Sequence, residues 1–579
     1  MSPGIAPAPG SPYAARPWLG LLSPAQRAPV APPASVLHAF RSAVARAPDR
    51  TALAYFDGRT DYAEADALSD SVAGHLALRG VRRGDRVAVM LQNTPHFVLA
   101  VLAAWKAGAV VVPLNPMYKS GEVGHILRDS GAVALVCDDR AWTAYLGGAA
   151  AGTAVRTVLT AHERDFQTRN DPRVLKSDAG RDEHEAGREG REAVPAGPGA
   201  REVGLGACDF AAVARQGHPA PADPLLTAAD TALISYTSGT SGTPKGALNP
   251  HGALTYNAVR QVTGHPVPEG ATYFALAPLF HITGMVCQLA ACFANAGTLA
   301  LAHRFDAGTV LDALLEHRPA YTVGPATAFM ALAAHPDATA DHFASLRVVS
   351  SGGAPLPPAL VERLRADFGF YLRNGYGLTE CTAPCASVPA HLEAPVDPAS
   401  GALSVGLPGA DTVVRVLDEH GAEVPLGEAG EIAVRGPQVV PGYWGLPDDT
   451  ARAFPDGELR TGDIGFMDEA GWLYVVDRKK DMINASGFKV WPREVEDVLY
   501  THPAVREAAV VGVPDPYRGE SVKAYVSLRP GASAEPAELS AYCAARIAAY
   551  KYPRQVEILP VLPKTTSGKI LRRELRDRG

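Results

Sequence analysis

The chain has 579 residues, of which 47% are apolar and 20% are charged, and its formal net charge is -7. This length exceeds one ordinary domain and predicts two or more hydrophobic cores. The negative charge, with basic residues scattered along the chain, excludes a nucleic-acid-binding protein that depends on neutralising phosphates.

The first 35 residues are rich in proline and alanine and predict a flexible leader. They lack a basic stretch followed by a long apolar one, so they do not predict a signal peptide. The most apolar run, around residues 98–114, is interrupted by Lys106 and Pro113 and is too short to cross a bilayer. Seven irregularly spaced cysteines predict reduced thiols. We therefore expect a cytoplasmic protein without an integral membrane segment.

An N-terminal domain is predicted over residues 36–476, where strand and helix patterns alternate. Its first elements are an apolar helix at 95–106 and buried strands at 85–90, 108–114 and 132–137. Strands and helices that alternate at this spacing predict an α/β fold, with a parallel sheet covered by helices.

Residues 163–206 interrupt this domain with a charged, glycine-rich stretch that has few apolar side chains. Such a stretch cannot bury enough surface to offset its ordering entropy, so it predicts a disordered surface insertion.

A second domain is predicted over residues 482–579, after a charged hinge at 477–481. It has strand patterns at 508–513 and 522–528, a helix pattern at 537–549 and a basic tail. These elements predict a small α+β unit.

The strongest local signal is the segment Tyr236–Gly246 (YTSGTSGTPKG), which follows a short apolar strand. Glycines let backbone N–H groups approach an anion closely, hydroxyls add donors, and Lys245 adds a positive charge. The segment therefore predicts a polyphosphate-binding loop, with a plain flexible turn as the alternative. It is not a Walker loop, because Lys245 lies between Pro244 and Gly246 and no Ser or Thr follows it.

This loop resembles the signature of the adenylate-forming superfamily, which includes acyl-CoA synthetases, peptide-synthetase adenylation domains and firefly luciferase. Further motifs similar to those of the family follow in order: SGGAPL at 351–356, NGYGLTE at 374–380, TGD at 461–463 and PKTTSGK at 563–569. The resemblance runs from about residue 35 to the end, apart from the insertion. It implies a large N-terminal domain of parallel sheets with helices, a small β-barrel-like subdomain, and a small mobile C-terminal α+β domain.

The resemblance implies that ATP, Mg²⁺ and coenzyme A take part in the reaction. A carboxylate is already ionised at pH 7, so the site must supply charge neutralisation and alignment rather than a base. Lys569 would lie near the carboxylate and the α-phosphate, and Glu380 and Thr237 would hold Mg²⁺. The predicted phosphate-binding residues are Thr237, Ser238, Gly239, Thr240, Ser241, Gly242, Lys245 and, nearer the α-phosphate, Thr379.

Other motif positions are assigned to the nucleoside, to coenzyme A and to the acid by the same resemblance. Asp463 and Arg478 would bind the ribose hydroxyls, and Tyr376 would pack on adenine, framed by Gly353, Ala354 and Pro355. Asn374, Gly375 and Gly377, in the same motif as Tyr376, are assigned to nucleotide binding as well. Lys480 occupies the hinge position, and Gly487 would line the pantetheine tunnel. His281, in the segment PLFHITG, would gate the acyl pocket.

The acid substrate is expected to be apolar. The gate segment at 280–284 contains no acidic side chain, which disfavours an α-amino acid, and the candidate pocket walls at 284–293 and 321–330 carry no charge. We therefore expect a medium- or long-chain fatty acid, with an aryl acid as the close alternative.

Other functions stay open at this level. A fatty acyl-AMP ligase that transfers its product to an acyl carrier protein is one alternative. A catalytically dead nucleotide-binding relative is the non-enzyme alternative, although it would have lost Lys569 or Glu380 and both are present. Chain length and oligomeric state stay open as well, with homodimers common in the family.

Overall fold

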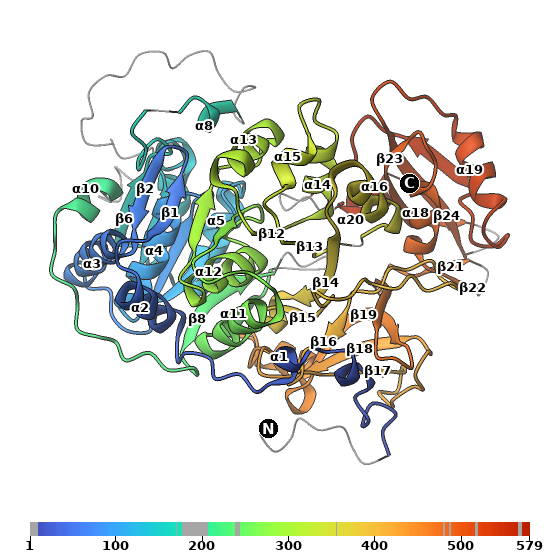
Figure 1. The fold of residues 1–579 in the computed structure, drawn as a ribbon, viewed down its shortest axis with the longest axis horizontal. Helices are drawn as coiled ribbons and strands as arrows, with labels where there is room; N and C mark the ends of the chain where they lie inside the picture. The colour runs from blue at the N-terminus through green and yellow to red at the C-terminus, as the bar shows by residue number, and fades with distance from the viewer. Residues whose placement is uncertain are drawn as a thin grey trace.

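Two large sheets share one layer of helices, and two smaller sheets follow them along the chain (Figure 1). The computed structural model describes residues 10–169, 171–176, 206–237, 244–354, 356–478, 481–485, 488–515, 519–564 and 570–578. Among these residues, no helix combines the length and the apolar character needed to span a membrane.

The first large sheet has seven strands in the order β7-β6-β5-β3-β4-β8-β9, parallel except for β9 at the edge. Val87 and Val89 of β3 face the shared helix layer, whereas Ala88 and Met90 face outer helices, which explains its uninterrupted apolar run. The strands are β3 (Arg86–Met90), β4 (Val110–Pro113), β5 (Ala134–Asp138), β6 (Thr157–Ala161), β7 (Ala207–Asp209), β8 (Thr231–Tyr236) and β9 (Gly246–Pro250). The three predicted strands and the predicted helix at 95–106 are confirmed.

The second large sheet has nine strands in the order β16-β15-β14-β13-β12-β10-β11-β1-β2. Its strands from β1 to β14 are parallel, and β2, β15 and β16 at the two edges are antiparallel. They are β1 (Thr51–Tyr55), β2 (Gly58–Asp61), β10 (Thr272–Phe274), β11 (Thr298–Leu301), β12 (Tyr321–Gly324), β13 (Val348–Gly352), β14 (Leu372–Leu378), β15 (Ala383–Ser387) and β16 (Leu407–Pro408).

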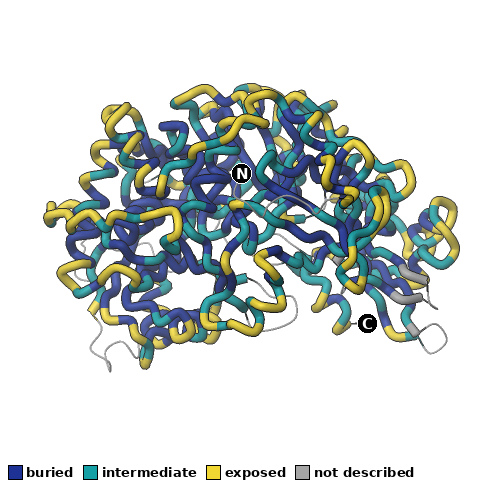
Figure 2. The backbone as a smooth tube through the Cα atoms, turned by 90° about the horizontal axis from the view of Figure 1, so that it is seen from below, coloured by how far each residue is buried: buried dark blue, intermediate teal, exposed yellow. Residues whose placement is uncertain are grey.

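Helices cover both faces of each large sheet. The shared layer holds α2 (Val36–Arg46), α3 (Tyr62–Leu78), α4 (Pro95–Lys106), α10 (Phe210–Arg215), α11 (His251–Gly264), η3 (Gly284–Ala290) and α12 (Ala291–Ala294). The outer layers hold α5 (Ser120–Ser130), η2 (Trp142–Leu146) and α7 (Gly147–Ala150) on one side, and α13 (Ala307–His317), α14 (Ala326–Ala333), α15 (Ala340–Phe343) and α16 (Pro358–Phe368) on the other. Figure 2 shows the buried backbone, in dark blue, running through the interior, with exposed yellow segments at the surface.

The two smaller sheets match the predicted subdomain and C-terminal unit. An antiparallel sheet contains β17 (Val413–Leu417), β18 (Gly430–Arg435), β19 (Leu459–Met467) and β20 (Leu473–Arg478), with α17 (Pro447–Ala453) and η5 (Pro455–Gly457) between its strands. The C-terminal unit has its own core and contains β21 (Ile483–Ala485), β22 (Phe488–Val490), α18 (Pro492–Tyr500), β23 (Val505–Asp515), β24 (Gly519–Leu528), α19 (Pro536–Ala544), β25 (Gln555–Ile558) and α20 (Arg572–Arg576). The helix predicted at 537–549 therefore ends earlier, at Ala544.

Residues 13–22 pack against the antiparallel sheet and residues 24–27 against α11, which differs from the predicted flexible leader. They contain η1 (Pro17–Gly20) and α1 (Pro24–Arg27), beside the orange strands in Figure 1. Tyr13 and Trp18 are fully buried in the core of that sheet, and the Tyr13 hydroxyl donates to the Val424 carbonyl at 3.0 Å. Gly471 accommodates the segment, because a Cβ there would lie 2.3 Å from the Trp18 backbone nitrogen.

We expect Trp18→Ala to lower the free energy of unfolding by about 3–5 kcal/mol, since the change leaves a large cavity in a packed core. Urea unfolding followed by far-UV circular dichroism measures the loss, with Arg27→Ala, an exposed position of the same segment, as the control. Equal stability of the two variants would mean that residues 10–35 do not contribute to the core.

The first part of the predicted disordered insertion is ordered, contrary to what its composition suggests. Residues 163–169 and 171–176 are described and packed, and they include α8 (Arg173–Lys176). The Tyr55 hydroxyl donates to the Glu163 carbonyl at 2.8 Å, and buried His96 lies 3.1 Å from the Asp165 carboxylate. Polar side chains in this stretch thus find buried partners, which composition does not reveal. Residues 177–205 lie outside the described residues.

His251, the first residue of α11, is fully buried beside Trp105, with ring centroids 5.3 Å apart. Burial lowers the pKa of His251 from 6.5 to about 4. The unfolded chain therefore binds the proton more tightly, and stability is lost as pH falls from 6.5 to 4, by up to about 3 kcal/mol from this residue.

Replacing His251 with leucine is expected to flatten the pH dependence of stability in this window, with little change at pH 7. Urea midpoints between pH 4 and pH 8 test this, with exposed His420→Leu as the matched control. An unchanged pH slope in the His251 variant would show that another group is responsible.

Candidate active site

The predicted phosphate-binding loop connects two antiparallel strands, β8 and β9. Its ends are closed by a hydrogen bond of 2.9 Å from the Thr237 N–H to the Lys245 carbonyl. The loop therefore leads into a strand, unlike a Walker loop, which leads into a helix. Ser238, Gly239, Thr240, Ser241 and Gly242 lie outside the described residues.

Tyr376 and Asp463, which the sequence assigns to one nucleoside, lie together although they are far apart along the chain. Tyr376 is on β14 and Asp463 on β19, and the Tyr376 hydroxyl donates to the Asp463 carboxylate at 2.7 Å. Their exposed fractions are only 8% and 5%, and burial raises the pKa of Tyr376 well above its ordinary value of 10. Arg478 is the antiparallel partner of Asp463 on β20. The fold thus brings Tyr376 and Asp463, from two different sheets, into direct contact.

Asn374 and Gly377, the motif residues on either side of Tyr376, make or permit close backbone contacts. Buried Asn374 donates from its amide to the Ser404 carbonyl at 3.1 Å and accepts from the Gly375 N–H at the same distance. At Gly377 a Cβ would lie 1.9 Å from the Ala383 carbonyl oxygen, so the close approach of β15 requires glycine.

Gly353 and Ala354 follow β13, beside Gly375. Gly353 has a φ of +80°, a left-handed conformation that favours glycine. Pro355 lies outside the described residues.

Glu380 lies in η4 (Thr379–Cys381), directly after β14. Its carboxylate is contacted by Tyr443, a residue outside the predicted motifs. The Tyr443 hydroxyl donates to a Glu380 carboxylate oxygen at 2.9 Å, and the Thr379 carbonyl accepts from the Asn249 amide at the same distance. The Glu380 carboxylate and the Thr237 hydroxyl both offer hard oxygen atoms, the type of ligand that Mg²⁺ prefers.

Lys245 also has a partner that sequence reasoning missed. Its ammonium lies 2.5 Å from an Asp449 carboxylate oxygen and 5.3 Å from the centroid of the Tyr443 ring. Tyr443 and Asp449 belong to the stretch between β18 and η5, which lies outside the motifs that carry the family resemblance. Only the fold brings this stretch to Glu380 and Lys245.

The predicted gate residue, His281, precedes η3, and its Nδ1 accepts from the Thr283 N–H at 3.4 Å. Buried Asn93, after β3, fixes this segment: its amide donates to the Ala275 and Ala277 carbonyls, and its oxygen accepts from the Leu279 N–H at 2.8 Å. Asn93 thereby ties the first large sheet to the gate segment, a contact that sequence reasoning did not identify.

Three predicted site residues of the hinge and the smaller domain lie outside the described part of the chain: Lys480, Gly487 and Lys569. Asp481, the last residue of the predicted hinge, pairs with Arg572 at 3.3 Å and with Arg576 at 2.6 Å. The Leu571 N–H donates to the Pro563 carbonyl at 2.9 Å. The two ends of the segment that contains Lys569 are thus joined and anchored beside the hinge.

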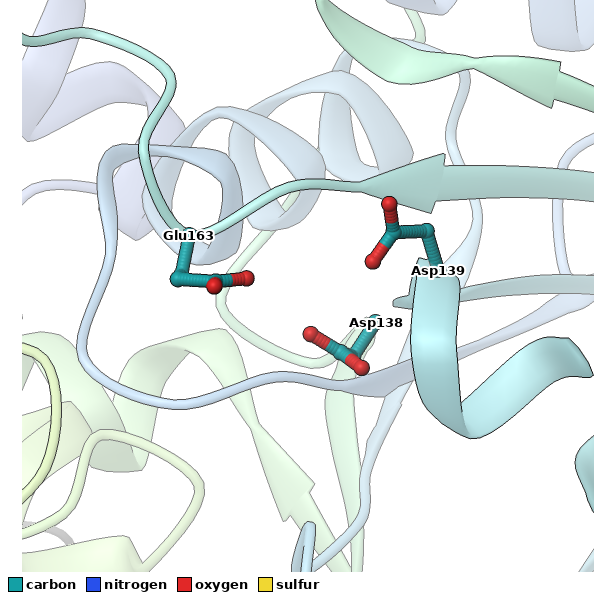
Figure 3. Close-up of side chains that lie close together, drawn as sticks. All are labelled: Asp138, Asp139 and Glu163. Atoms are coloured by element: carbon teal, nitrogen blue, oxygen red, sulfur yellow. The ribbon is translucent and has the colours of Figure 1, made fainter. Parts of the chain in front are cut away.

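A separate cluster of carboxylates, Asp138, Asp139 and Glu163, lies at the carboxyl ends of β5 and β6 (Figure 3). Asp138 accepts from the Ala141 N–H at 2.9 Å and begins α6 (Asp139–Ala141), and Glu163 pairs with Arg140 at 2.7 Å. Burial raises the pKa of Asp138 to about 6. Protein partners thus account for two of the three side chains, and none of the predicted site residues belongs to the cluster.

Comparisons with known proteins agree with this arrangement. The family model described as AMP-binding enzyme matches residues 40–444, and the model of the AMP-binding enzyme C-terminal domain matches residues 494–569. A feruloyl-CoA synthase from Amycolatopsis sp. is 37% identical over 92% of this chain and 96% of its own length. A long-chain-fatty-acid–CoA ligase from Bacillus subtilis (strain 168) is 33% identical over 92% of both chains.

Solved structures of similar proteins cover nearly the whole chain. The anthranilate CoA ligase AuaEII in complex with anthranoyl-AMP has a TM-score of 0.81 and 25% identity, over 96% of this chain and 99% of that one. ATP-bound MatB from Rhodopseudomonas palustris has a TM-score of 0.77 and 27% identity, over 94% and 98%. The chain therefore belongs to the AMP-binding enzyme family.

Proposed function

We propose that the protein is an ATP-dependent acid–thiol ligase that activates a carboxylic acid as an acyl-adenylate and transfers the acyl group to coenzyme A. One observation carries the proposal. Lys245 comes from the phosphate-loop motif, Tyr376 and Glu380 from the motif at 374–380, and Asp463 from the motif at 461–463, and all four serve one nucleotide in the resembled family. In the fold Lys245 and Glu380 both contact Tyr443, and the Tyr376 hydroxyl donates to the Asp463 carboxylate. Relatives named as CoA ligases match the chain over nearly its full length.

In the first half-reaction a carboxylate oxygen attacks the α-phosphorus of ATP, the P–O bond to pyrophosphate breaks, and acyl-AMP forms. Lys569 and Lys245 would neutralise the charge on the acid and on the phosphates, and Asp463 would orient the ribose. Mg²⁺, held by Glu380 and Thr237, would supply further neutralisation of the phosphate oxygens. In the second half-reaction the sulfur of coenzyme A attacks the acyl carbon and AMP leaves.

The substrate we propose is a medium- or long-chain fatty acid. The two candidate pocket walls are predominantly apolar and carry no charged side chain, and Met285, Val286, Leu289 and Phe329 on them are buried. An aryl acid is the second candidate, because a feruloyl-CoA synthase is among the similar proteins. Apolar walls discriminate weakly between such acids.

We propose a cytoplasmic location for the protein. The seven cysteines form no disulfide, which supports a cytoplasmic location. Transfer to an acyl carrier protein and a homodimeric state stay predictions.

A pyrophosphate-release assay with MgATP tests the proposal, over a panel of fatty, aryl and amino acids, with and without coenzyme A, and with products identified by mass spectrometry. Acyl-CoA formed from aliphatic acids supports the primary substrate, and acyl-CoA formed only from aryl acids selects the second candidate. Pyrophosphate without thioester would replace the CoA ligase with an adenylate-only ligase. If no acid of the panel caused pyrophosphate release, the protein would not be an active ligase for these acids.

A further inference from the structure

The stretch Val440–Asp449 supplies a partner to each of two oppositely charged residues of the candidate phosphate site. Asp449 pairs with Lys245, and Tyr443 donates to Glu380 while its ring lies beside the same lysine. Neither Asp449 nor Tyr443 takes part in the two proposed half-reactions.

The stretch is fixed in place from both sides. The Trp444 N–H donates to the Gly246 carbonyl at 2.8 Å and the Leu248 N–H to the Gly442 carbonyl at 3.0 Å, which join it to β9. The Val440 N–H donates to the Glu380 carbonyl at 2.9 Å, which joins it to the loop after β14. Asp449 is therefore positioned by the same contacts that position the candidate site.

The pair between Asp449 and Lys245 is close but partly open to solvent. The lysine side chain is 39% exposed and the aspartate side chain 24%, and Arg452 shares the same carboxylate oxygen at 2.8 Å. Ion pairs with this exposure are weak, because water screens them. An anion with several negative charges, such as a polyphosphate, can therefore take Lys245 from Asp449, whereas an anion with less charge competes less well.

We propose that Asp449 is a positioning residue that holds Lys245 between turnovers and competes with ATP and pyrophosphate for it. The inference rests on the proposed function, because it takes Lys245 as a phosphate-binding residue. The competition weakens substrate binding slightly, and it helps pyrophosphate to leave, since Lys245 has a partner to return to.

The expected result is that Asp449→Asn binds MgATP and pyrophosphate about two- to fivefold more tightly, the factor by which a weak ion pair competes. Isothermal titration without the acid gives the dissociation constant of MgATP, and pyrophosphate inhibition of adenylate formation gives its inhibition constant. The KM values for the acid and for coenzyme A should not change. Asp448→Asn is the matched control, because Asp448 is the exposed neighbouring carboxylate.

A double-mutant cycle separates competition for Lys245 from a general effect of charge. In a Lys245→Met background, Asp449→Asn should no longer tighten MgATP binding. Unchanged or weaker binding of MgATP by Asp449→Asn in the otherwise wild-type protein would overturn the inference, as would equal effects at positions 448 and 449. Failure of the wild-type protein to bind MgATP would instead contradict the proposed function.

Discussion

Replacing Lys569 with alanine is expected to slow acyl-adenylate formation about 10²–10³-fold, because a positioned cation that meets charge developing in the transition state is lost. The same variant should still convert preformed acyl-AMP and coenzyme A to acyl-CoA, since the second half-reaction does not use that charge. Single-turnover assays of the two half-reactions, each started separately, measure the effect.

The control for Lys569 is Arg573→Ala, which removes an exposed cation of α20, after the same motif. Because Leu571 bonds to Pro563 and Asp481 pairs with Arg572 and Arg576, damage to this region should impair both half-reactions equally. Equal loss of both in the Lys569 variant would therefore argue against separate roles for the lysine in the two steps.

Glu380→Gln is expected to slow adenylate formation by about 10²-fold at moderate Mg²⁺ and to raise the Mg²⁺ concentration needed for half-maximal rate at least about tenfold. The amide keeps an oxygen that can accept from Tyr443 but loses the negative charge that a hard cation requires. Initial rates over a Mg²⁺ series measure this, together with ATP binding in the presence and absence of Mg²⁺.

Two variants separate the charge of Glu380 from its position. Tyr443→Phe removes the donor to Glu380 but keeps the carboxylate, so its Mg²⁺ requirement should rise less than that of Glu380→Gln. Exposed Glu469→Gln should behave like the wild type. If Glu380→Gln lowers the rate equally at all Mg²⁺ concentrations, Glu380 is not a metal ligand.

Much of the fold follows from local patterns along the chain. The central strands β3, β4 and β5 are nearly continuous apolar runs because both of their faces are buried, and α4 has the bounds that its pattern predicted. Two motif glycines have equally local causes. Gly353 has a positive φ, and Gly377 leaves room for the carbonyl of Ala383 in the neighbouring strand. Fold class, the succession of elements and the candidate nucleotide motifs could therefore be predicted.

Long-range partners could not be predicted in the same way. Trp18 lies in a proline- and alanine-rich stretch with no periodic pattern, yet it is fully buried against β-strands more than 390 residues away. Asp165 looked like part of a solvated charge run, but it is buried against His96. The composition of a segment indicates how many apolar side chains it can bury. It does not indicate whether a distant part of the chain will pack against it.

Local patterns therefore predict the family, the order of the elements and the residue types suited to phosphate, ribose and Mg²⁺. The side chains that contact these residues, such as Tyr443 for Glu380, Asp449 for Lys245 and Asn93 for the gate segment, become evident only in the folded chain. Backbone conformation depends mainly on neighbours in sequence. A hydrogen bond or an ion pair depends instead on neighbours in space, and packing of distant elements brings these together.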